Sequence, residues 1–319
     1  MLERPTILVG ALGTGTAFGA VSAIRRNFSR DVRVLGIDIN PPSLVTASLL
    51  CDQTFQVGPS DAPEFAGRLV ALIHEHRIHA FLPLLPGEID SAIRIPHQAQ
   101  IPPSFEFLFG SLALAGLTLD KLTLFEWLRK QGLPTPMTAL AGLAFGENQY
   151  FLKPRAGAGS RGARRVSALE LSSLPEARDD AWIIQEICDG TEVTVDAFSD
   201  PELGFFRALA RERIEVKSGV STKCRIREDP ELAGFAASIA SALGVSGSFC
   251  FQVIGKPGSW RITDLNPRPG AATAMSVACG NDFFGAMFAR WLGRDYSGMF
   301  GVLDRPAIVT RQYADFRMD

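Results

Sequence analysis

Lys153 and the glycines that follow it could handle a polyphosphate. Lys153 follows the expected strand residues 149–152, and Gly157, Gly159 and Gly162 come after it within nine residues. A fixed positive charge next to exposed backbone N–H groups suits phosphate oxygens. A plain surface loop would use the same residues, so this segment alone leaves both interpretations open. It is not a Walker A loop, because no Gly-Lys-Ser/Thr follows.

Three oxygen-bearing side chains follow in a second cluster. Asp264 and Asn266 are two residues apart, so on a strand they project to one face. If residues 255–259 form a hairpin, Gln252 joins them on that face. Mg²⁺ takes few protein oxygens and uses phosphate oxygens for the rest. An exposed polar hairpin is the alternative, but it would not predict Asn-Pro-Arg directly afterwards, where Arg268 can hold an anion in a bidentate contact.

The segment from Gln185 to Glu192 joins two expected strands, 182–186 and 191–198. Backbone groups at such a junction can read an adenine edge, while Glu192 accepts hydrogen bonds from ribose hydroxyls. Any β-turn would look similar in sequence.

The first third of the chain must fold as repeated βαβ units. Apolar strand patterns alternate there with helical ones, which predicts a parallel sheet covered on both faces. The expected strands are 6–10, 32–38 and 80–84, and the expected helices are 20–27 and 63–76. We expect a Rossmann-like domain over residues 1–115.

The glycine-rich turn of this domain permits a different function. Gly10, Gly13, Gly15 and Gly19 precede an acid at the end of the next strand, Asp38. An NAD(P)-dependent oxidoreductase would use such a turn for its pyrophosphate and such an acid for its ribose. Phe18 stands where the G-x-G-x-x-G pattern that starts at Gly13 needs glycine, so the motif is imperfect.

The rest of the chain predicts an α+β arrangement. Asp120 is a suitable N-cap for a helix whose Leu122, Phe125 and Leu128 would share one buried face. A further helix over 231–243 leads into an antiparallel pair of strands, 248–254 and 260–266.

Taken in order, these segments resemble the ATP-grasp superfamily, in particular its branch of carbamoyl phosphate synthetase large subunits and biotin carboxylases. Asp120-Lys121, Phe151-Leu152-Lys153-Pro154 with its glycine loop, Gln185-Glu186-Ile187-Cys188 and Asp264-Leu265-Asn266-Pro267-Arg268 carry the resemblance. It covers almost the whole chain. It implies an α/β Rossmann-like pre-ATP-grasp domain over 1–115 and an α+β ATP-grasp domain over 116–319, with a smaller lid subdomain at 116–180 and a larger subdomain at 181–319.

The resemblance also implies site residues and two cofactors, ATP and one or two Mg²⁺ ions. The ATP-binding residues would be Lys121, Lys153, Gly157, Gly159, Ser160, Gly162, Gln185, Glu186, Ile187, Cys188, Glu192 and Leu265. The metal ligands would be Gln252, Asp264 and Asn266. Lys153, Arg268 and the Gly270 N–H would act in catalysis. A variable loop formed by 211–213 with 218–223 would border the acceptor, with Arg213, Ser221 and Arg268 contacting substrate.

The implied reaction is ADP-forming ligation. A substrate carboxylate attacks the γ-phosphate of ATP to give an acyl phosphate, and an amine or similar nucleophile then displaces phosphate. The family often has glutamate where this chain has Gln252 and Asp264. The lower carboxylate count keeps open a non-catalytic protein that only binds nucleotide. Cys250 replaces the arginine of D-alanine ligases and argues against that substrate class.

Composition sets the remaining limits. The chain has 319 residues with 32 Lys+Arg and 34 Asp+Glu, a balance that argues against a nucleic-acid partner. We expect small-molecule carboxylate and amine substrates and a possible homodimer. With no signal-peptide pattern and no run of 18 apolar residues, we expect a cytoplasmic protein without membrane partners. The five cysteines form no C-x-x-C motif, and all four histidines lie at or before position 97.

Overall fold

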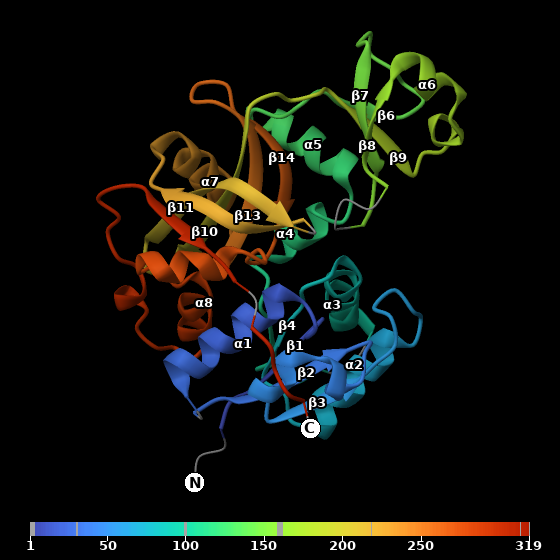
Figure 1. Cartoon of the computed structure of the whole chain (residues 1–319). Coiled ribbons are helices and arrows are strands. Elements are labelled where there is room, and N and C mark those ends of the chain that lie inside the picture. Colours follow the sequence, from blue (N-terminus) through green and yellow to red (C-terminus); the bar gives the residue numbers. More distant parts are fainter. Residues whose placement is uncertain are drawn as a thin grey trace.

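The protein is built on three sheets stacked in tiers, shown in Figure 1 from the blue N-terminal tier to the green tier at the opposite end. The structure, a computed structural model, describes residues 4–29, 31–98, 101–157, 162–217, 219–312 and 314–318. The expected fold class, an α/β Rossmann-like part followed by an α+β part, is confirmed by the parallel pairing in the first sheet and the antiparallel pairing in the other two.

The N-terminal sheet is parallel and five-stranded, in the order β3-β2-β1-β4-β5. Its strands are β1 (Thr6–Val9), β2 (Arg33–Asp38), β3 (Gln53–Gln56), β4 (Ala80–Leu82) and β5 (Glu106–Phe107), and its helices are α1 (Gly15–Phe28), α2 (Phe65–Glu75) and α3 (Pro86–Gln98). Ile7 and Val9 pack with α1, whereas Leu8 packs with α2 on the other face. Both faces are therefore buried, as crossover helices require.

The smaller antiparallel sheet has the order β6-β9-β7-β8. Its elements are β6 (Thr138–Leu140), β7 (Gln149–Pro154), β8 (Arg164–Ser167), α6 (Ala168–Ser173) and β9 (Trp182–Gln185). Strand β9 pairs with both β6 and β7. This pairing takes the smaller sheet past the expected subdomain limit at residue 180, because β9 lies between β6 and β7 in that sheet.

The larger antiparallel sheet has six strands in the order β14-β13-β10-β11-β12-β15. They are β10 (Thr191–Asp200), β11 (Phe205–Lys217), β12 (Val220–Arg227), β13 (Gly247–Gly255), β14 (Arg261–Asn266) and β15 (Ala307–Thr310), and the helices around them are α4 (Leu112–Leu117), α5 (Lys121–Lys130), α7 (Pro230–Leu243) and α8 (Phe283–Trp291). Short 3-10 turns cover 42–44, 46–50, 175–178, 273–279 and 297–299. Helix α5 buries Leu124, Phe125 and Leu128, and the expected Leu122 is only half-buried.

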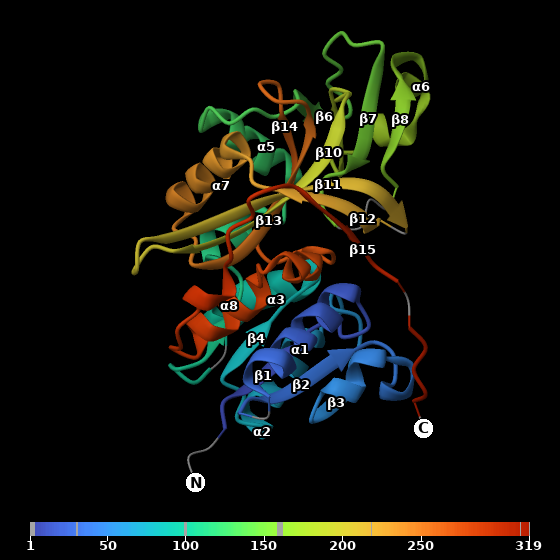
Figure 2. The same ribbon diagram turned by 60° about the vertical axis from the view of Figure 1, so that its left-hand side comes forward.

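The two faces of this sheet differ. Val193, Val195 and Ala197 of β10 pack in one apolar cluster with α5 and α7. On the other face, Phe198 joins a cluster that contains α8 and α1. Figure 2 shows α8 lying between the six-stranded sheet and the N-terminal tier. This continuous core fixes the N-terminal tier against one half of the face and leaves the other half for polar side chains.

A buried carboxylate organises the N-terminal tier. Glu88 of α3 accepts hydrogen bonds from the backbone N–H groups of Ala11 (2.8 Å), Leu84 (2.7 Å) and Leu85 (3.1 Å). A Cβ at Gly10 would lie 2.3 Å from Glu88 Oε2, so only glycine leaves room for this carboxylate. Glu88 therefore joins the loops that follow β1 and β4.

We predict that Glu88→Gln lowers the free energy of unfolding by about 1–3 kcal/mol, because the amide NH₂ would face a backbone N–H in place of an acceptor. Burial raises the pKa of Glu88 to about 7, although its hydrogen bonds and the Arg268 charge oppose this. A raised pKa favours the folded state at low pH, so the wild type should lose stability from about pH 5 to pH 8. The variant should lack that dependence.

Denaturant unfolding at several pH values measures both effects, with Glu126→Gln on the exposed face of α5 as the matched control. A Glu88→Gln variant as stable as the wild type, with the same pH profile, would contradict this role for Glu88.

Candidate active site

One half-face of the six-stranded sheet carries a row of polar side chains. Antiparallel register aligns Arg211 with Thr194, Thr194 with Gln252, and Gln252 with Asp264. Residues directly opposite one another on paired strands project to the same face. Four strands therefore present polar groups to the same side of the sheet, opposite the apolar cluster of Val193 and Val195.

The three predicted metal ligands lie together at one end of this row. Gln252 is opposite Asp264, and Asn266 follows two residues later and donates from Nδ2 to Asp264 Oδ2 at 3.0 Å. The expectation that they share a face of a hairpin is confirmed. Among the described residues no group of three His, Cys, Asp or Glu side chains could hold a metal. One carboxylate and two amide oxygens fit Mg²⁺ only if phosphate oxygens complete the coordination.

Lys153, at the end of β7, is a buried cation. It is 8% exposed, its Nζ donates to the Thr263 carbonyl at 3.3 Å, and it lies 4.6 Å from the centre of the Phe125 ring. Burial lowers the pKa of Lys153 to about 8, and the negative charge of Asp264 opposes that shift. The lysine thus sits beside the predicted metal ligands, at the place where the smaller and larger sheets meet.

Lys121 is held close to Lys153 by a helix cap. Asp120 accepts hydrogen bonds from Leu122 N (3.0 Å) and Thr123 N (3.4 Å), so α5 begins at Lys121. Lys121 Nζ donates to the Gly157 carbonyl at 2.7 Å. Burial lowers the pKa of Lys121, while the charges of Asp264 and Asp120 raise it. The negative charge of Asp264 therefore acts on the pKa of both predicted lysines.

Sequence reasoning missed Arg155, which joins these two elements. Its guanidinium forms a fork on Asp120, with Nε at 2.9 Å from Oδ1 and Nη2 at 2.6 Å from Oδ2, and its carbonyl accepts from Lys121 N at 3.0 Å. The hydrogen bonds from Arg155 lower the pKa of Asp120. Its position just after Lys153-Pro154 is the only sequence signal it gives.

The glycine loop is only partly described. Gly157 (φ +98°) and Gly162 (φ +75°) adopt left-handed backbone that favours glycine. The other two predicted loop residues, Gly159 and Ser160, lie outside the described residues.

The predicted adenine hinge continues from β9. Gln185 is buried and donates to Thr138 Oγ1 at 2.8 Å. Glu186 and Met137 exchange two hydrogen bonds, from Glu186 N to the Met137 carbonyl (2.9 Å) and from Met137 N to Glu186 Oε2 (3.1 Å). Ile187 and Cys188 follow, and the charge of Lys153 acts on the Cys188 thiol, whose pKa burial raises to about 11. The hinge therefore reaches the lysine pair.

Most of the residues expected to border the acceptor lie on two paired strands and not in a loop. The expected variable loop of 211–213 with 218–223 is mostly strand, because β11 runs to Lys217 and β12 starts at Val220. Within it, Arg213 pairs with Glu192, the predicted ribose acid, and donates to the Gly219 carbonyl at 2.8 Å. Ser221 is buried, and its hydroxyl has no hydrogen-bond partner among the described residues.

The side chain of Leu265 projects away from the polar row. It is opposite Phe251 and packs in the apolar cluster behind the sheet, because side chains alternate along the strand between Asp264 and Asn266. Its role in ATP binding stays a prediction.

Arg268 and Gly270 lie where the site meets the N-terminal tier. Arg268 Nε donates to the Leu84 carbonyl at 2.8 Å, and its Nη1 donates to the Pro269 carbonyl at 2.9 Å. The Gly270 N–H donates to Thr273 Oγ1 at 2.8 Å. That amide already has an acceptor in this structure, so the expected oxyanion role would require it to exchange partners.

Comparisons with known proteins agree with this geometry. Residues 118–272 match the family model described as ATP-grasp domain, a range that holds the two lysines, the predicted hinge and the predicted metal ligands. This part of the chain is an ATP-grasp domain. A comparison with curated protein sequences gives no match.

Solved structures share the fold. N5-carboxyaminoimidazole synthetase of Staphylococcus aureus with ADP gives a TM-score of 0.76 at 12% identity, over 98% of this chain and 83% of that one. The biotin carboxylase domain of Hydrogenobacter thermophilus 2-oxoglutarate carboxylase, a dimer with MgADP and bicarbonate, gives 0.74 at 16%, over 92% and 71%. Campylobacter jejuni biotin carboxylase gives 0.69 at 16%, over 92% and 72%.

The backbone N–H groups that an NAD(P) pyrophosphate would need in the glycine turn after β1 already have acceptors. The Gly13 N–H, which a pyrophosphate would need, donates to Asp38 Oδ2 at 2.7 Å, and the Ala11 N–H donates to Glu88. Both carboxylates line a cavity of about 240 Å³ at the carboxyl ends of the parallel strands. Two acids bonded to the turn would repel a pyrophosphate. These contacts favour a structural role for the glycine turn, which precedes the ATP-grasp domain in the sequence.

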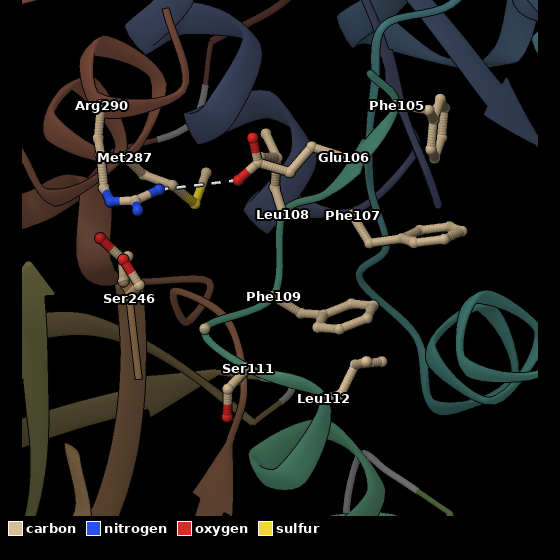
Figure 3. A pocket seen from close by; sticks show the side chains of 13 residues that line it. Phe105, Glu106, Phe107, Leu108, Phe109, Ser111, Leu112, Ser246, Met287 and Arg290 are labelled. Carbon is tan, nitrogen blue, oxygen red and sulfur yellow. Dashed lines mark ion pairs between the residues drawn. The ribbon is translucent and has the colours of Figure 1, made fainter. Parts of the chain in front are cut away.

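A larger cavity, of about 300 Å³, lies between β5, the start of β13 and α8. Figure 3 shows Glu106 and Leu108 directed toward Arg290 of α8, and Phe107 and Phe109 directed away from it. Nη1 of Arg290 lies 3.7 Å from Glu106 Oε1, and Nε of Arg290 lies 3.5 Å from Asp200 Oδ2. None of the predicted site residues lines this cavity, so its size does not mark the ATP-grasp site. Among the described residues, no helix is long and apolar enough to cross a bilayer.

We predict that polyphosphate binding to this domain takes up a proton. With a pKa of about 8 before binding, Lys153 is partly neutral at pH 8 to 9, and a polyanion favours its charged form. The affinity for MgATP should therefore fall by up to about tenfold per pH unit above pH 8. Calorimetry in buffers of different ionisation enthalpy measures the proton. The variant Lys153→Arg stays charged and should show no uptake, so equal uptake by both proteins would contradict the prediction.

Proposed function

We propose that this chain is an ATP-dependent ligase that activates a carboxylate as an acyl phosphate, with release of ADP, and joins it to an amine or similar nucleophile with release of phosphate. MgATP would supply the phosphoryl group. The observation that carries the proposal is the placement of two partly desolvated lysines, Lys121 and Lys153, against the row of Gln252, Asp264 and Asn266.

The residues have distinct roles in this proposal. Lys121 and Lys153 bind phosphate oxygens, and Gly157 and Gly162 allow the loop backbone to approach them. Phosphoryl transfer depends on positioning and charge neutralisation rather than on covalent help from the protein. Gln252, Asp264 and Asn266 hold Mg²⁺ through oxygen atoms. The Gln185–Cys188 backbone takes the adenine, and Glu192, which is 37% exposed, accepts from ribose.

Arg268 would bind the substrate anion at the junction with the N-terminal tier. Its bond to the Leu84 carbonyl ties that role to residues 1–115, which we propose as a separate Rossmann-like domain that shapes the substrate cleft. The ATP-grasp domain would extend from 116 to 319, with β6 to β9 as the lid. A homodimer remains part of the proposal.

The variant Lys153→Ala should abolish nucleotide turnover. Loss of one preorganised donor to a transition state costs on the order of 10²- to 10³-fold in rate, and Lys153 also contributes a full charge. Calorimetry with MgATP and a coupled ADP assay measure binding and turnover. Lys256→Ala, at an exposed lysine in the turn between β13 and β14, is the control. Full ATP turnover by Lys153→Ala would overturn the assigned role.

A substrate screen tests the reaction itself. ADP and phosphate release are measured against amino acids, dipeptides and small dicarboxylates, each paired with a panel of amines, and the product mass is read directly. We expect one pair to release ADP and phosphate together and to give a product lighter than the summed substrates by one water. Tight MgATP binding with no release for any pair would instead indicate a nucleotide-binding protein without ligase activity.

A further inference from the structure

A buried ion pair lies beside the predicted metal ligands of the six-stranded sheet. Arg211 of β11 is 2% exposed and Asp196 of β10 is 1% exposed. Nε of Arg211 lies 3.0 Å from Asp196 Oδ2, and Nη2 lies 3.1 Å from Oδ1. Such a two-point contact fixes the plane of the guanidinium. In register, Arg211 belongs to the same row as Gln252 and Asp264.

The pair leaves most of the arginine's donors unused. A guanidinium has five N–H donors, and the contact with Asp196 uses two of them. Nη1 of Arg211 donates no hydrogen bond within the part of the chain that the structure describes. Donors that remain on a guanidinium already fixed in its plane are available to an oxyanion ligand.

The guanidinium lies at the turn that follows Arg268. A Cβ on Gly270 would be 3.9 Å from Nη2 of Arg211 and 3.4 Å from Cys250 Sγ, so with glycine no side chain of residue 270 stands between the turn and the guanidinium. Thr273 Oγ1 donates to Asp196 Oδ1 at 2.6 Å and accepts from the Gly270 N–H at 2.8 Å. The same carboxylate thus holds both the arginine and the turn.

We propose that Arg211 binds an oxyanion of the reacting substrate, either its carboxylate or the phosphoryl group that the carboxylate receives. The inference rests on the proposed ligase function and adds a second arginine to Arg268. Asp196 is the positioning residue. It holds the guanidinium in place before the anion arrives, so little side-chain freedom is lost on binding, and Arg268 contributes the positive charge that Asp196 offsets.

Arg213, the arginine expected at this place, is less suited. Its Nη1 is paired with Glu192, and its Nη2 donates to the Gly219 carbonyl at 2.8 Å. These contacts direct it toward the predicted ribose side and the β11–β12 turn. The two arginines stand two residues apart on one strand, and only Arg211 faces the Gly270 turn.

The test follows the arginine Nε–Hε signals in ¹H–¹⁵N spectra of the full chain during titration with inorganic phosphate and, separately, with acetate. Each titration is run with and without MgADP. The Arg211 signal is assigned by its loss in Arg211→Lys. The variants are Arg211→Met, Arg211→Lys and, in case the unpaired Asp196 prevents folding, the double variant Asp196→Asn with Arg211→Met. The control is Arg225→Met, which removes a strand arginine paired with Glu212 on the opposite face of β11 and β12.

We expect the Arg211 signal to shift with at least one anion and the affinity for that anion to fall at least tenfold in Arg211→Met. Arg211→Lys should also weaken binding, because an ammonium lacks the fork. Affinity for MgADP, which lacks the transferred phosphoryl group, should stay within twofold of wild type in every variant, and Arg225→Met should bind the anion as wild type does. A response to acetate assigns the site to a carboxylate, and a response to phosphate alone assigns it to the phosphoryl group.

The proposal is overturned if neither anion moves the Arg211 signal, or if folded Arg211 variants, judged by thermal unfolding, bind both anions within twofold of wild type. A wild-type chain that fails to bind MgATP would instead refute the ligase function. The titrations without nucleotide would still decide the role of Arg211.

Discussion

The structure depends on placing the ammonium group of Lys153 in a largely apolar position without a close counter-ion. Within the described residues no carboxylate lies within 4 Å of its Nζ, and the nearest support comes from the Phe125 ring, the Thr263 carbonyl and the longer-range charge of Asp264. A desolvated cation of this kind lowers stability in the free protein. A polyanionic ligand would remove this unfavourable free energy by pairing with the cation. Part of the ligand's binding free energy would come from that change.

The second constraint is the division of one sheet face into two halves. Phe198 and Leu209 join the core with α8 and α1, whereas Glu192, Thr194 and Asp196 on the same side of β10 are polar. The apolar half holds the N-terminal tier rigidly against the sheet. Arg268 and Glu88 extend this attachment to the site, because Arg268 bonds to the Leu84 carbonyl and Glu88 accepts from the Leu84 N–H. In the proposed function, substrate binding near Arg268 would therefore be coupled to the loops that follow β1 and β4.

Local sequence signals predicted the residues that act within one element or one hairpin. Asp120 as a cap, Lys153 at a strand end, and the face shared by Gln252, Asp264 and Asn266 each follow from spacing. The sequence could not show that Arg211 pairs with Asp196, because that contact is diagonal and depends on the exact register of β10 and β11, in which Asp196 is opposite Leu209. It could not show that Arg155 reaches Asp120, because those residues are 35 positions apart in different elements. The same limit explains why the expected subdomain boundary at residue 180 separates β9 from the smaller sheet in which it pairs.

The side chains of the predicted metal ligands affect the order in which nucleotide and Mg²⁺ would bind. A single carboxylate, Asp264, with two amides offers a divalent cation much less charge than a site with several acids, and the nearby lysines lower the negative potential further. In the free protein the positive groups therefore dominate and favour phosphate over metal. In the proposed reaction, Mg²⁺ would arrive on the nucleotide, and Gln252, Asp264 and Asn266 would orient it rather than recruit it. Because every histidine lies at or before position 97, such a site would depend on positioned charges and not on imidazole acid–base groups.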